Sequence, residues 1–364
     1  MKARVKKIFE NTESSPDLIL VKNGVEPFID KNFFYATNLK HGLFENTVAV
    51  LYPDGDIDLI VSQLEAEAAK KKGDLNLKLY QGEEEKQNFL KECLESGDTV
   101  GLNYMGVSHR DFHDLEEFVD KDFVDVYDGF KKSRMIKDTE EIEYIRRAAE
   151  IVDEVVGRIP GVVSDDMAEY ELAAEINYLM QKNGADDVAF ETISSFGGNT
   201  AIPHYTHGDR KLCGGDIILC DFGACFGKYN SDITRSFVFK KASDRQKEMY
   251  KCVLEAQRRG IDVIQPGVEA EEVHKVVKNF IDNNGFKGFF IHSTGHSLGL
   301  DVHDPGVGFK SDCDVELKEN MVLTVEPGIY LPRYGGIRIE DDILVTKDGA
   351  ELLTKSSKEF CEIS

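Results

Sequence analysis

The feature that most limits the fold of this chain is an internal repeat in its second half. A Pro-Gly pair, a helix-like segment ending in Asn-Gly and a strand-like segment ending in a Gly-containing loop occur twice, at residues 160–197 and 266–295. A further helix-like stretch precedes each copy, at 140–158 and 244–264. Self-similarity along a chain indicates repeated supersecondary units. We therefore expect two related halves, with helices outside and strands inside, that face each other across a cleft.

The residues before the repeat alternate strand-like and helix-like segments. The strand-like segments are 17–22, 46–52 and 57–61, and the helix-like ones are 64–72 and 84–92. This pattern predicts a small α/β domain at 1–128, followed by a larger domain at 129–364. An amphipathic helix from about 140 to 158, with Thr139 as its N-cap, opens the larger domain. The predicted fold class is α/β (α+β) in two domains.

Charge and composition exclude two kinds of partner. The chain has 44 basic and 67 acidic residues, a net charge of −23, whereas binding to nucleic acid needs a basic surface. No apolar run approaches the roughly 20 residues that span a bilayer, so we expect no membrane partner. The basic N-terminal residues 1–7 are not followed by an apolar core. The seven scattered cysteines form no CxxC pair, which favours reduced thiols and a cytoplasmic protein.

Four acidic residues in the second half form two candidate pairs. A hairpin that turns at 226–227 would set Asp221 opposite Asp232, and a second Gly-containing turn would do the same for Glu326 and Glu340. Directly opposed Cβ atoms lie roughly 4.5–5.5 Å apart. Two carboxylates at that distance repel each other unless a cation lies between them.

The surroundings of these acids favour a metal site over two solvated acid pairs. The neighbouring residues are mostly apolar, and charges among such neighbours need compensation. They include Ile217, Leu219, Val322, Thr324, Ile337 and Ile339. A Gly-rich run, 292–305, adds three histidines, of which His296 is the candidate ligand. Four carboxylates and one imidazole suit Mn²⁺ or Co²⁺ better than a structural zinc ion, and they would nearly neutralise two such ions.

Five motifs, in order along the chain, carry a resemblance to a known family. They are Phe190–His204, Asp221–Arg235, His292–His303, Glu326–Tyr330 and Gly336–Asp341. They resemble the Xaa-Pro dipeptidase (prolidase) and aminopeptidase P family of pita-bread metallopeptidases, and the resemblance extends over the chain to a creatinase-type N-terminal domain. It implies a pita-bread catalytic domain with a pseudo-two-fold repeat, and two divalent metal ions per chain.

The resemblance also implies a role for each metal ligand. Asp221 would ligate one ion, Glu326 and His296 would ligate the other, and Asp232 and Glu340 would bridge both.

The remaining residues of these motifs would serve the substrate. The bond before proline is a tertiary amide without an N–H, and His204 and His303 resemble the family's substrate-contacting histidines. His303 would donate to the scissile carbonyl oxygen, His204 would steady the substrate near the leaving nitrogen, and Glu326 would move a proton to that nitrogen. Arg338 would orient the acids, and His292 would line the pocket.

The predicted function is hydrolysis of Xaa-Pro bonds by a homodimeric exopeptidase that acts on proline-containing peptides. Two alternatives stay open. Val307 stands where several dipeptidases of the family have an arginine that binds the substrate's terminal carboxylate, and Lys310 is the nearest cation, so an aminopeptidase acting on longer peptides is the first alternative. The second is a catalytically inactive peptide-binding relative, but such relatives typically lose ligands, and all five are present here.

Overall fold

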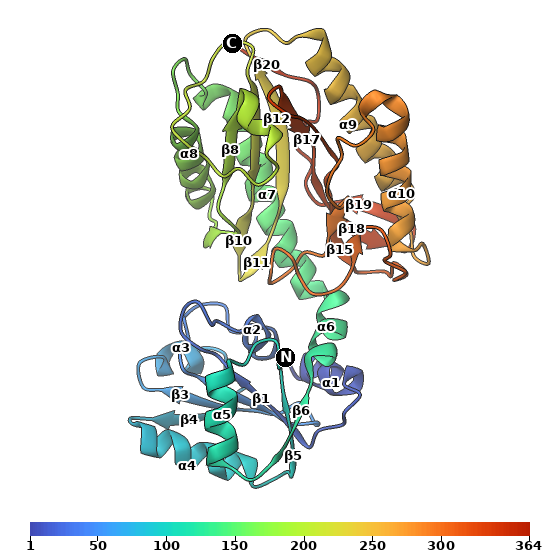
Figure 1. The fold of residues 1–364 in the computed structure, drawn as a ribbon. Coiled ribbons are helices and arrows are strands. Elements are labelled where there is room, and N and C mark those ends of the chain that lie inside the picture. Colours follow the sequence, from blue (N-terminus) through green and yellow to red (C-terminus); the bar gives the residue numbers. More distant parts are fainter. The chain divides into compact units, whose positions relative to one another are not determined.

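The computed structural model describes residues 1–364 and divides into two compact units, Met1–Arg134 and Met135–Ser364 (Figure 1). The predicted boundary, between residues 128 and 129, lies near the start of helix α6 (Tyr127–Met135), and the two units divide near the end of that helix. No helix is both long enough and apolar enough to cross a membrane.

The first unit is built on one mixed sheet with the strand order β4-β3-β2-β1-β5-β6. Strands β1, β2 and β3 are antiparallel neighbours, and β4, β5 and β6 are added in parallel. The strands are β1 (Leu18–Lys22), β2 (Val48–Leu51), β3 (Ile57–Ser62), β4 (Asn76–Tyr80), β5 (Thr99–Leu102) and β6 (Asp122–Asp125). The helices are α1 (Lys2–Asn11), α2 (Lys31–Thr37), α3 (Ala66–Lys70), α4 (Glu83–Leu94), α5 (His109–Phe118) and α6. The predicted α/β character of this unit is confirmed.

The second unit places strands between two pairs of helices (Figure 1). The helices are α7 (Thr139–Val162) and α8 (Glu169–Lys182) on one side, and α9 (Asp244–Asp262) and α10 (Ala270–Ile281) on the other. One sheet has the order β20-β12-β9-β8, a second β11-β10-β7, a third β15-β18-β19, and β16-β17 and β13-β14 are two-stranded. The strands are β7 (Asp187–Val188), β8 (Ile193–Phe196), β9 (Ile217–Phe222), β10 (Ala224–Phe226), β11 (Tyr229–Asn230), β12 (Ile233–Phe239), β13 (Gly295–His296), β14 (Gly308–Phe309), β15 (Val322–Val325), β16 (Gly328–Leu331), β17 (Gly335–Arg338), β18 (Asp341–Thr346), β19 (Gly349–Leu352) and β20 (Glu362–Ile363).

The predicted repeat is visible in the backbone hydrogen bonds of the second unit. Where α8 begins, the amide of Glu169 donates to the carbonyl of Arg210 at 3.1 Å, and where α10 begins, the amide of Ala270 donates to the carbonyl of Val315 at 3.0 Å. The bonds on both sides of these two follow the same pattern. The expectation of two related halves is confirmed, and Glu169 and Ala270 occupy matching places in them.

Helix α7 differs from its prediction at both ends. Asp138, not Thr139, is the N-cap: its carboxylate accepts from the Glu141 amide at 2.9 Å, and the Glu141 carboxylate accepts from the Asp138 amide at 2.9 Å. This reciprocal pair satisfies two amides that the helix start leaves free. The helix also continues through Pro160 to Val162, past the predicted end at 158, and beyond the proline the Val163 amide donates to the Ile159 carbonyl at 3.2 Å.

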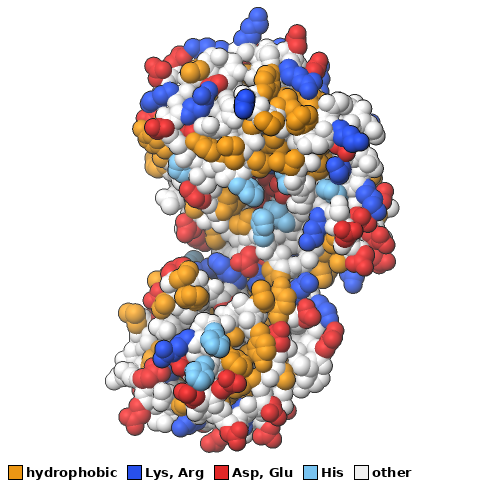
Figure 2. Space-filling model, viewed as in Figure 1, with side chains coloured by type: hydrophobic (Ala, Val, Ile, Leu, Met, Phe, Trp, Pro, Cys, Tyr) orange, Lys and Arg blue, Asp and Glu red, His pale blue; other side chains and the backbone are white.

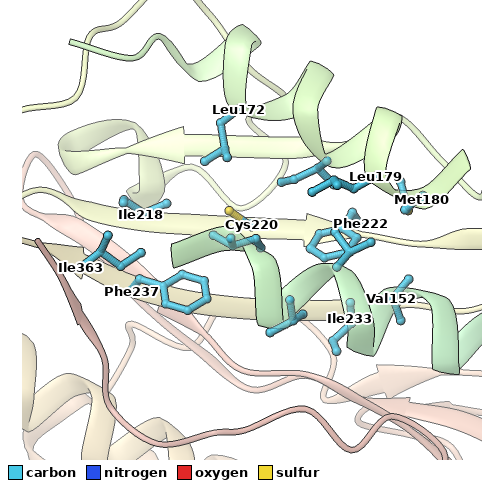
Figure 3. Packing of buried hydrophobic residues seen from close by; sticks show 14 of the residues in the cluster. Val152, Leu172, Leu179, Met180, Ile218, Cys220, Phe222, Ile233, Phe237 and Ile363 are labelled. Atoms are coloured by element: carbon cyan, nitrogen blue, oxygen red, sulfur yellow. The ribbon is translucent and has the colours of Figure 1, made fainter. Parts of the chain in front are cut away.

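Strand β9 separates a hydrophobic core from the opposite face, on which the acids stand. Its residues Ile218, Cys220 and Phe222 pack against α7 and α8 in a cluster of buried side chains (Figure 3). Successive side chains of a strand point to opposite faces, so Asp221 points away from this core. The packing of one face therefore determines where the carboxylate on the other face is held.

Candidate active site

The second unit contains a cavity of about 590 Å³, and Figure 2 shows histidine side chains gathered around a hollow in this unit. All nine residues predicted for the site line this cavity, although they come from separate strands and loops. The lining residues are Phe190, Ile193, Pro203, His204, Asp221, Asp232, His292, Ser293, His296, Asp301, Val302, His303, Glu326, Arg338 and Glu340.

The first acid pair has a different register from the one predicted. Asp221 on β9 lies opposite Thr234 on β12, and not opposite Asp232. The turn falls one residue later than predicted, at Gly227 and Lys228, whose φ angles are 56° and 73°, as a two-residue hairpin turn requires. Moving the turn by one residue moves the partner by two, and side chains alternate with period two. Asp232 therefore stays on the same face as Asp221, as its diagonal neighbour.

The second acid pair has the predicted register. Gly328 of β16 lies opposite Arg338 of β17, and Val325 of β15 lies opposite Asp341 of β18. Glu326 and Glu340 stand between these two pairs, so the common register sets them opposite each other. The loop 332–334 between the strands is centred midway between Glu326 and Glu340, as predicted. The two hairpins together bring the acid cluster, Asp221, Asp232, Glu326 and Glu340, to one side of the cavity.

His296 completes this group with a nitrogen that has a free lone pair. Its Nε2 lies 3.6 Å from Asp232 Oδ2 and 3.7 Å from Glu326 Oε1. Its Nδ1 lies 3.1 Å from the carbonyl oxygen of Ser297, so the ring proton belongs on Nδ1, and Nε2 can act as a ligand. Burial, and then the neighbouring His303, lower the pKa of His296 to about 4. The imidazole is therefore neutral at physiological pH.

The acid cluster has the properties of a metal site. Buried oxygens of Asp221, Asp232 and Glu340 have no hydrogen-bond partner, and buried polar atoms rarely stay unpaired. Ligand atoms of Asp232, His296 and Glu340 all lie within 4.8 Å of one another. Burial, and then repulsion between the carboxylates, raise the pKa of Asp232 and of Glu340 well above their ordinary range. A divalent cation would pair these oxygens and neutralise the charges.

Arg338 is linked by hydrogen bonds to two of the acids, directly to Asp221 and through Thr234 to Glu340. Its Nη2 donates to Asp221 Oδ2 at 2.5 Å, its Nε donates to the Thr234 hydroxyl at 3.1 Å, and its Nη1 donates to the Tyr330 hydroxyl at 2.7 Å. The Thr234 hydroxyl donates in turn to Glu340 Oε2 at 2.6 Å. Sequence analysis missed Thr234, although its place two residues after Asp232, at the start of an extended segment, puts both side chains on the same face.

His292 lines the cavity with both ring nitrogens occupied. Its Nδ1 lies 2.7 Å from the Ser293 carbonyl oxygen, and its Nε2 lies 2.9 Å from the Tyr330 hydroxyl. Burial, and then the charge of Arg338, lower the pKa of His292 to about 3. These contacts leave it no lone pair directed at the acid cluster.

His204 and His303 reach the cavity from loops of different halves of the unit. His204 follows the 3₁₀ turn 197–201, and His303 lies between β13 and β14. The ring centroids of His303 and His296 are 4.0 Å apart. Burial lowers the pKa of His303, which favours a neutral ring with one N–H. Neither histidine belongs to the group of possible metal ligands formed by Asp232, His296 and Glu340.

The cavity lacks a surface cation for a substrate carboxylate. Val307 is 3% exposed and packs with Phe309 in the core, and its amide donates to the Ser297 hydroxyl at 2.9 Å. Lys310 is not among the lining residues either, and the one arginine or lysine that lines the cavity is the buried Arg338.

A second buried network, which sequence analysis did not find, lies behind the acid cluster. Arg235 and Asp341 form an ion pair at 2.7 Å with both side chains no more than 1% exposed. Arg235 also donates to the carbonyl of Glu340 at 2.6 Å, and Lys358 donates to Asp341 at 2.6 Å. A charged residue within a fully buried strand without other charges, ITRSFVF, was the available signal, because such residues are almost never buried without a partner.

A buried acid cluster with one imidazole, at a cavity of a repeated α/β unit, defines the class of a metal-dependent hydrolase. Residues 143–347 match the model of metallopeptidase family M24, and residues 4–136 match the creatinase/prolidase N-terminal domain. The chain therefore belongs to metallopeptidase family M24, and the predicted combination of a creatinase-type domain with a pita-bread domain is confirmed. Membership of this family implies divalent metal ions.

Relatives cover the full length of the chain. It is 36% identical to the Xaa-Pro dipeptidase of Pyrococcus furiosus, over 99% of this chain and 100% of the relative. It is 35% identical to the Xaa-Pro dipeptidase of Pyrococcus horikoshii, over 99% of both chains. Among solved structures, the X-Pro aminopeptidase of Thermotoga maritima superposes with a TM-score of 0.91 at 32% identity, over 98% of this chain and 99% of that one. The prolidase of Pyrococcus furiosus gives 0.86 at 34% identity, over 97% and 99%.

Proposed function

We propose that the protein is a metal-dependent exopeptidase that hydrolyses the bond before proline in Xaa-Pro dipeptides. The observation that carries the proposal is a single cavity in which the acid cluster and His296 meet two further histidines, His204 and His303. The substrate class is supported by the full-length likeness to two proteins named Xaa-Pro dipeptidase.

We assign two divalent ions to each chain, with Mn²⁺ or Co²⁺ as the expected metals because the donor set is rich in oxygen. Asp221 would hold one ion, Glu326 and His296 the other, and Asp232 and Glu340 both. Bound ions of this kind supply an acidified water, with a pKa lowered from about 15.7 to roughly 7, and polarise the scissile carbonyl. The unpaired buried oxygens of Asp221, Asp232 and Glu340 support this assignment.

The other residues would act on the substrate directly. His303 donates its one N–H to the scissile carbonyl oxygen as negative charge develops there. His204 contacts the substrate near the leaving nitrogen. Beside a bound cation the Glu326 carboxyl group would be ionised, so it can take the proton that the attacking water loses. Glu326 passes that proton to the proline nitrogen, which leaves as an amine only when it is protonated.

Apolar side chains in the lining of the cavity support proline as the leaving residue. Phe190, Ile193 and Val302 line the cavity together with His303. A pyrrolidine ring offers carbon surface and no N–H, so it can contact these side chains without leaving a donor unpaired.

The alternative function, cleavage of longer Xaa-Pro peptides, is favoured by one specific observation. No exposed cation lines the cavity, and without one a free carboxylate after proline gains no ion pair. A peptide that continues beyond proline would then lose little relative to a dipeptide. One solved relative is named an X-Pro aminopeptidase.

Steady-state kinetics on three peptides test both functions. We expect hydrolysis of Leu-Pro, strong rejection of Leu-Ala, and an Xaa-Pro-containing tripeptide cleaved with an efficiency within about a hundredfold of that of Leu-Pro. A chelator should abolish activity, and Mn²⁺ or Co²⁺ should restore it. Equal efficiencies on Leu-Ala and Leu-Pro would contradict the proposal. A greater preference for the dipeptide would show that another residue binds the carboxylate. No hydrolysis by the metal-loaded protein would favour the inactive relative.

We further propose a homodimer in the cytoplasm. Sedimentation velocity of the purified protein and fractionation of cells that express it test these two assignments.

A further inference from the structure

We infer that Glu169, at the start of α8, is a positioning residue for His204. The inference depends on the proposed function, because it gives Glu169 a role through a histidine that is proposed to contact the substrate. His204 lines the cavity, whereas Glu169 does not. Glu169 therefore acts on the reaction only through the segment that carries His204.

The carboxylate of Glu169 accepts four hydrogen bonds and has no basic partner. Its Oε1 accepts from the Phe196 amide at 2.8 Å and from the Asn199 side-chain amide at 2.9 Å. Its Oε2 accepts from the Gly208 amide at 3.0 Å and from the Tyr205 hydroxyl at 3.1 Å. The residue is 0% exposed, so these four donors take the place of water around a buried carboxylate.

All four donors belong to one segment, 196–208, that contains His204. Two of the donors are backbone amides at the ends of the segment, and Tyr205 is the direct neighbour of His204. Gly208 packs closely here: a Cβ atom at this position would lie 2.4 Å from the Tyr205 hydroxyl and 3.2 Å from Glu169 Oε2. One carboxylate thus ties both ends and the middle of the segment, which limits the positions open to His204 before substrate arrives.

A comparison with the other half of the unit shows that Glu169 is not required merely to form a helix start of this kind. Ala270 occupies the matching place at the start of α10, is buried, and makes the same kind of backbone bond to the loop beside it. The backbone arrangement therefore forms without a carboxylate. Glu169 is an addition specific to the half whose loop carries His204.

A double-mutant cycle with Glu169→Gln and His204→Ala tests the inference on the metal-loaded protein. Glutamine keeps the size of the side chain, but its NH₂ group cannot accept, so two of the four donors lose their acceptor. We expect Glu169→Gln to lower kcat/KM for Leu-Pro at least tenfold, mainly through kcat, with unchanged metal content. The double variant should be no slower than His204→Ala alone, because residues that act through one another are not additive.

The possible outcomes distinguish a failure of the role proposed for Glu169 from a failure of the role proposed for His204. If the losses from Glu169→Gln and His204→Ala multiply in the double variant, Glu169 does not act through His204, and the inference is wrong. If His204→Ala is as active as the wild type, the proposed role of His204 fails, and the inference fails with it. Glu171→Gln is the matched control: this exposed residue of the same helix turn accepts from the Ala168 amide, and we expect less than a twofold effect.

A milder variant and a measurement that does not depend on activity test the inference further, in case Glu169→Gln folds poorly. Tyr205→Phe removes one donor and leaves the buried carboxylate in place, and it should show the same non-additivity with His204→Ala. Amide hydrogen exchange on the metal-free protein should be faster in Glu169→Gln than in the wild type at Phe196 or at Gly208, whichever of the two amides loses its acceptor. Unchanged exchange at both amides would overturn the inference without any measurement of activity.

Discussion

The stability that the protein loses when its metal is removed should grow as the pH rises from 5 to 8. Burial raises the pKa of Glu326 to about 8 from its ordinary value of 4.5, which it regains in the unfolded chain. Within this pH window the folded metal-free protein keeps a proton that the unfolded chain has lost. Stability falls with rising pH wherever the folded state binds more protons, so the contribution of Glu326 has one sign throughout the window.

The size of the effect follows from the two pKa values. They differ by about 3.5, and one pKa unit corresponds to about 1.4 kcal/mol, so Glu326 alone destabilises the metal-free form by about 5 kcal/mol once the pH exceeds 8. In a domain of this size each kcal/mol lowers Tm by about 2–4 °C, which gives a shift of about 10–20 °C. Burial also raises the pKa of Asp232 and of Glu340, and both add to the loss. A bound cation favours the ionised carboxylates and removes it.

Differential scanning calorimetry of chelated and Mn²⁺-loaded protein between pH 5 and 8 measures this effect. The two transition temperatures should separate as the pH rises. Glu326→Gln is the matched control, since it keeps the shape of the side chain and cannot titrate, and its metal-free form should lose less stability over the same range. A gap between the two transition temperatures that stays constant or narrows from pH 5 to 8 would refute the reasoning.

Three further variants probe the site and its supports. Asp232→Ala should abolish metal binding and activity together while the first unit stays folded, as elemental analysis, kinetics and circular dichroism would show; near-normal activity would contradict the shared-ligand role. His303→Ala should lower kcat by roughly 10²–10³-fold with metal content unchanged, and loss of metal would make His303 a ligand instead. Lys137→Met should lower the free energy of unfolding by about 3–5 kcal/mol, because Lys137 and Asp304 pair at 3.0 Å with both side chains 1% exposed; adding Asp304→Asn should recover part of the loss in a urea titration.

The two acid pairs show how far sequence reasoning reaches in this protein. Counting residues about the turn placed Glu326 opposite Glu340, as the register has it. The same count failed for Asp221, because Gly227 and Lys228 adopt left-handed backbone conformations that move the turn by one residue. The face on which the acids stand was still predicted, since a shift of two residues does not change the side of a strand.

Residues that act through hydrogen bonds to distant segments could not be predicted in this way. Glu169 stands at a helix start, where an acidic residue is common, and nothing beside it in the sequence points to a loop about 30 residues later. Arg235 and Asp341 lie about 100 residues apart, so their pairing appears only when β12 and β18 are placed in space. Sequence motifs indicate residues expected to contact the metal or the substrate. Hydrogen-bond partners that come from distant parts of the chain are found only in the three-dimensional structure.

The division of the proposed ligands between the two halves of the second unit has a consequence for the amount of protein in a cell. Asp221 and Asp232 precede α9, whereas His296, Glu326 and Glu340 follow it, so neither half holds a complete site alone. Metal then binds the assembled unit in preference to partly folded chains, and it adds about 2.7 kcal/mol of stability at a concentration of 100 times its Kd. Cells deprived of the metal should therefore lose the polypeptide itself to proteolysis, in addition to its activity.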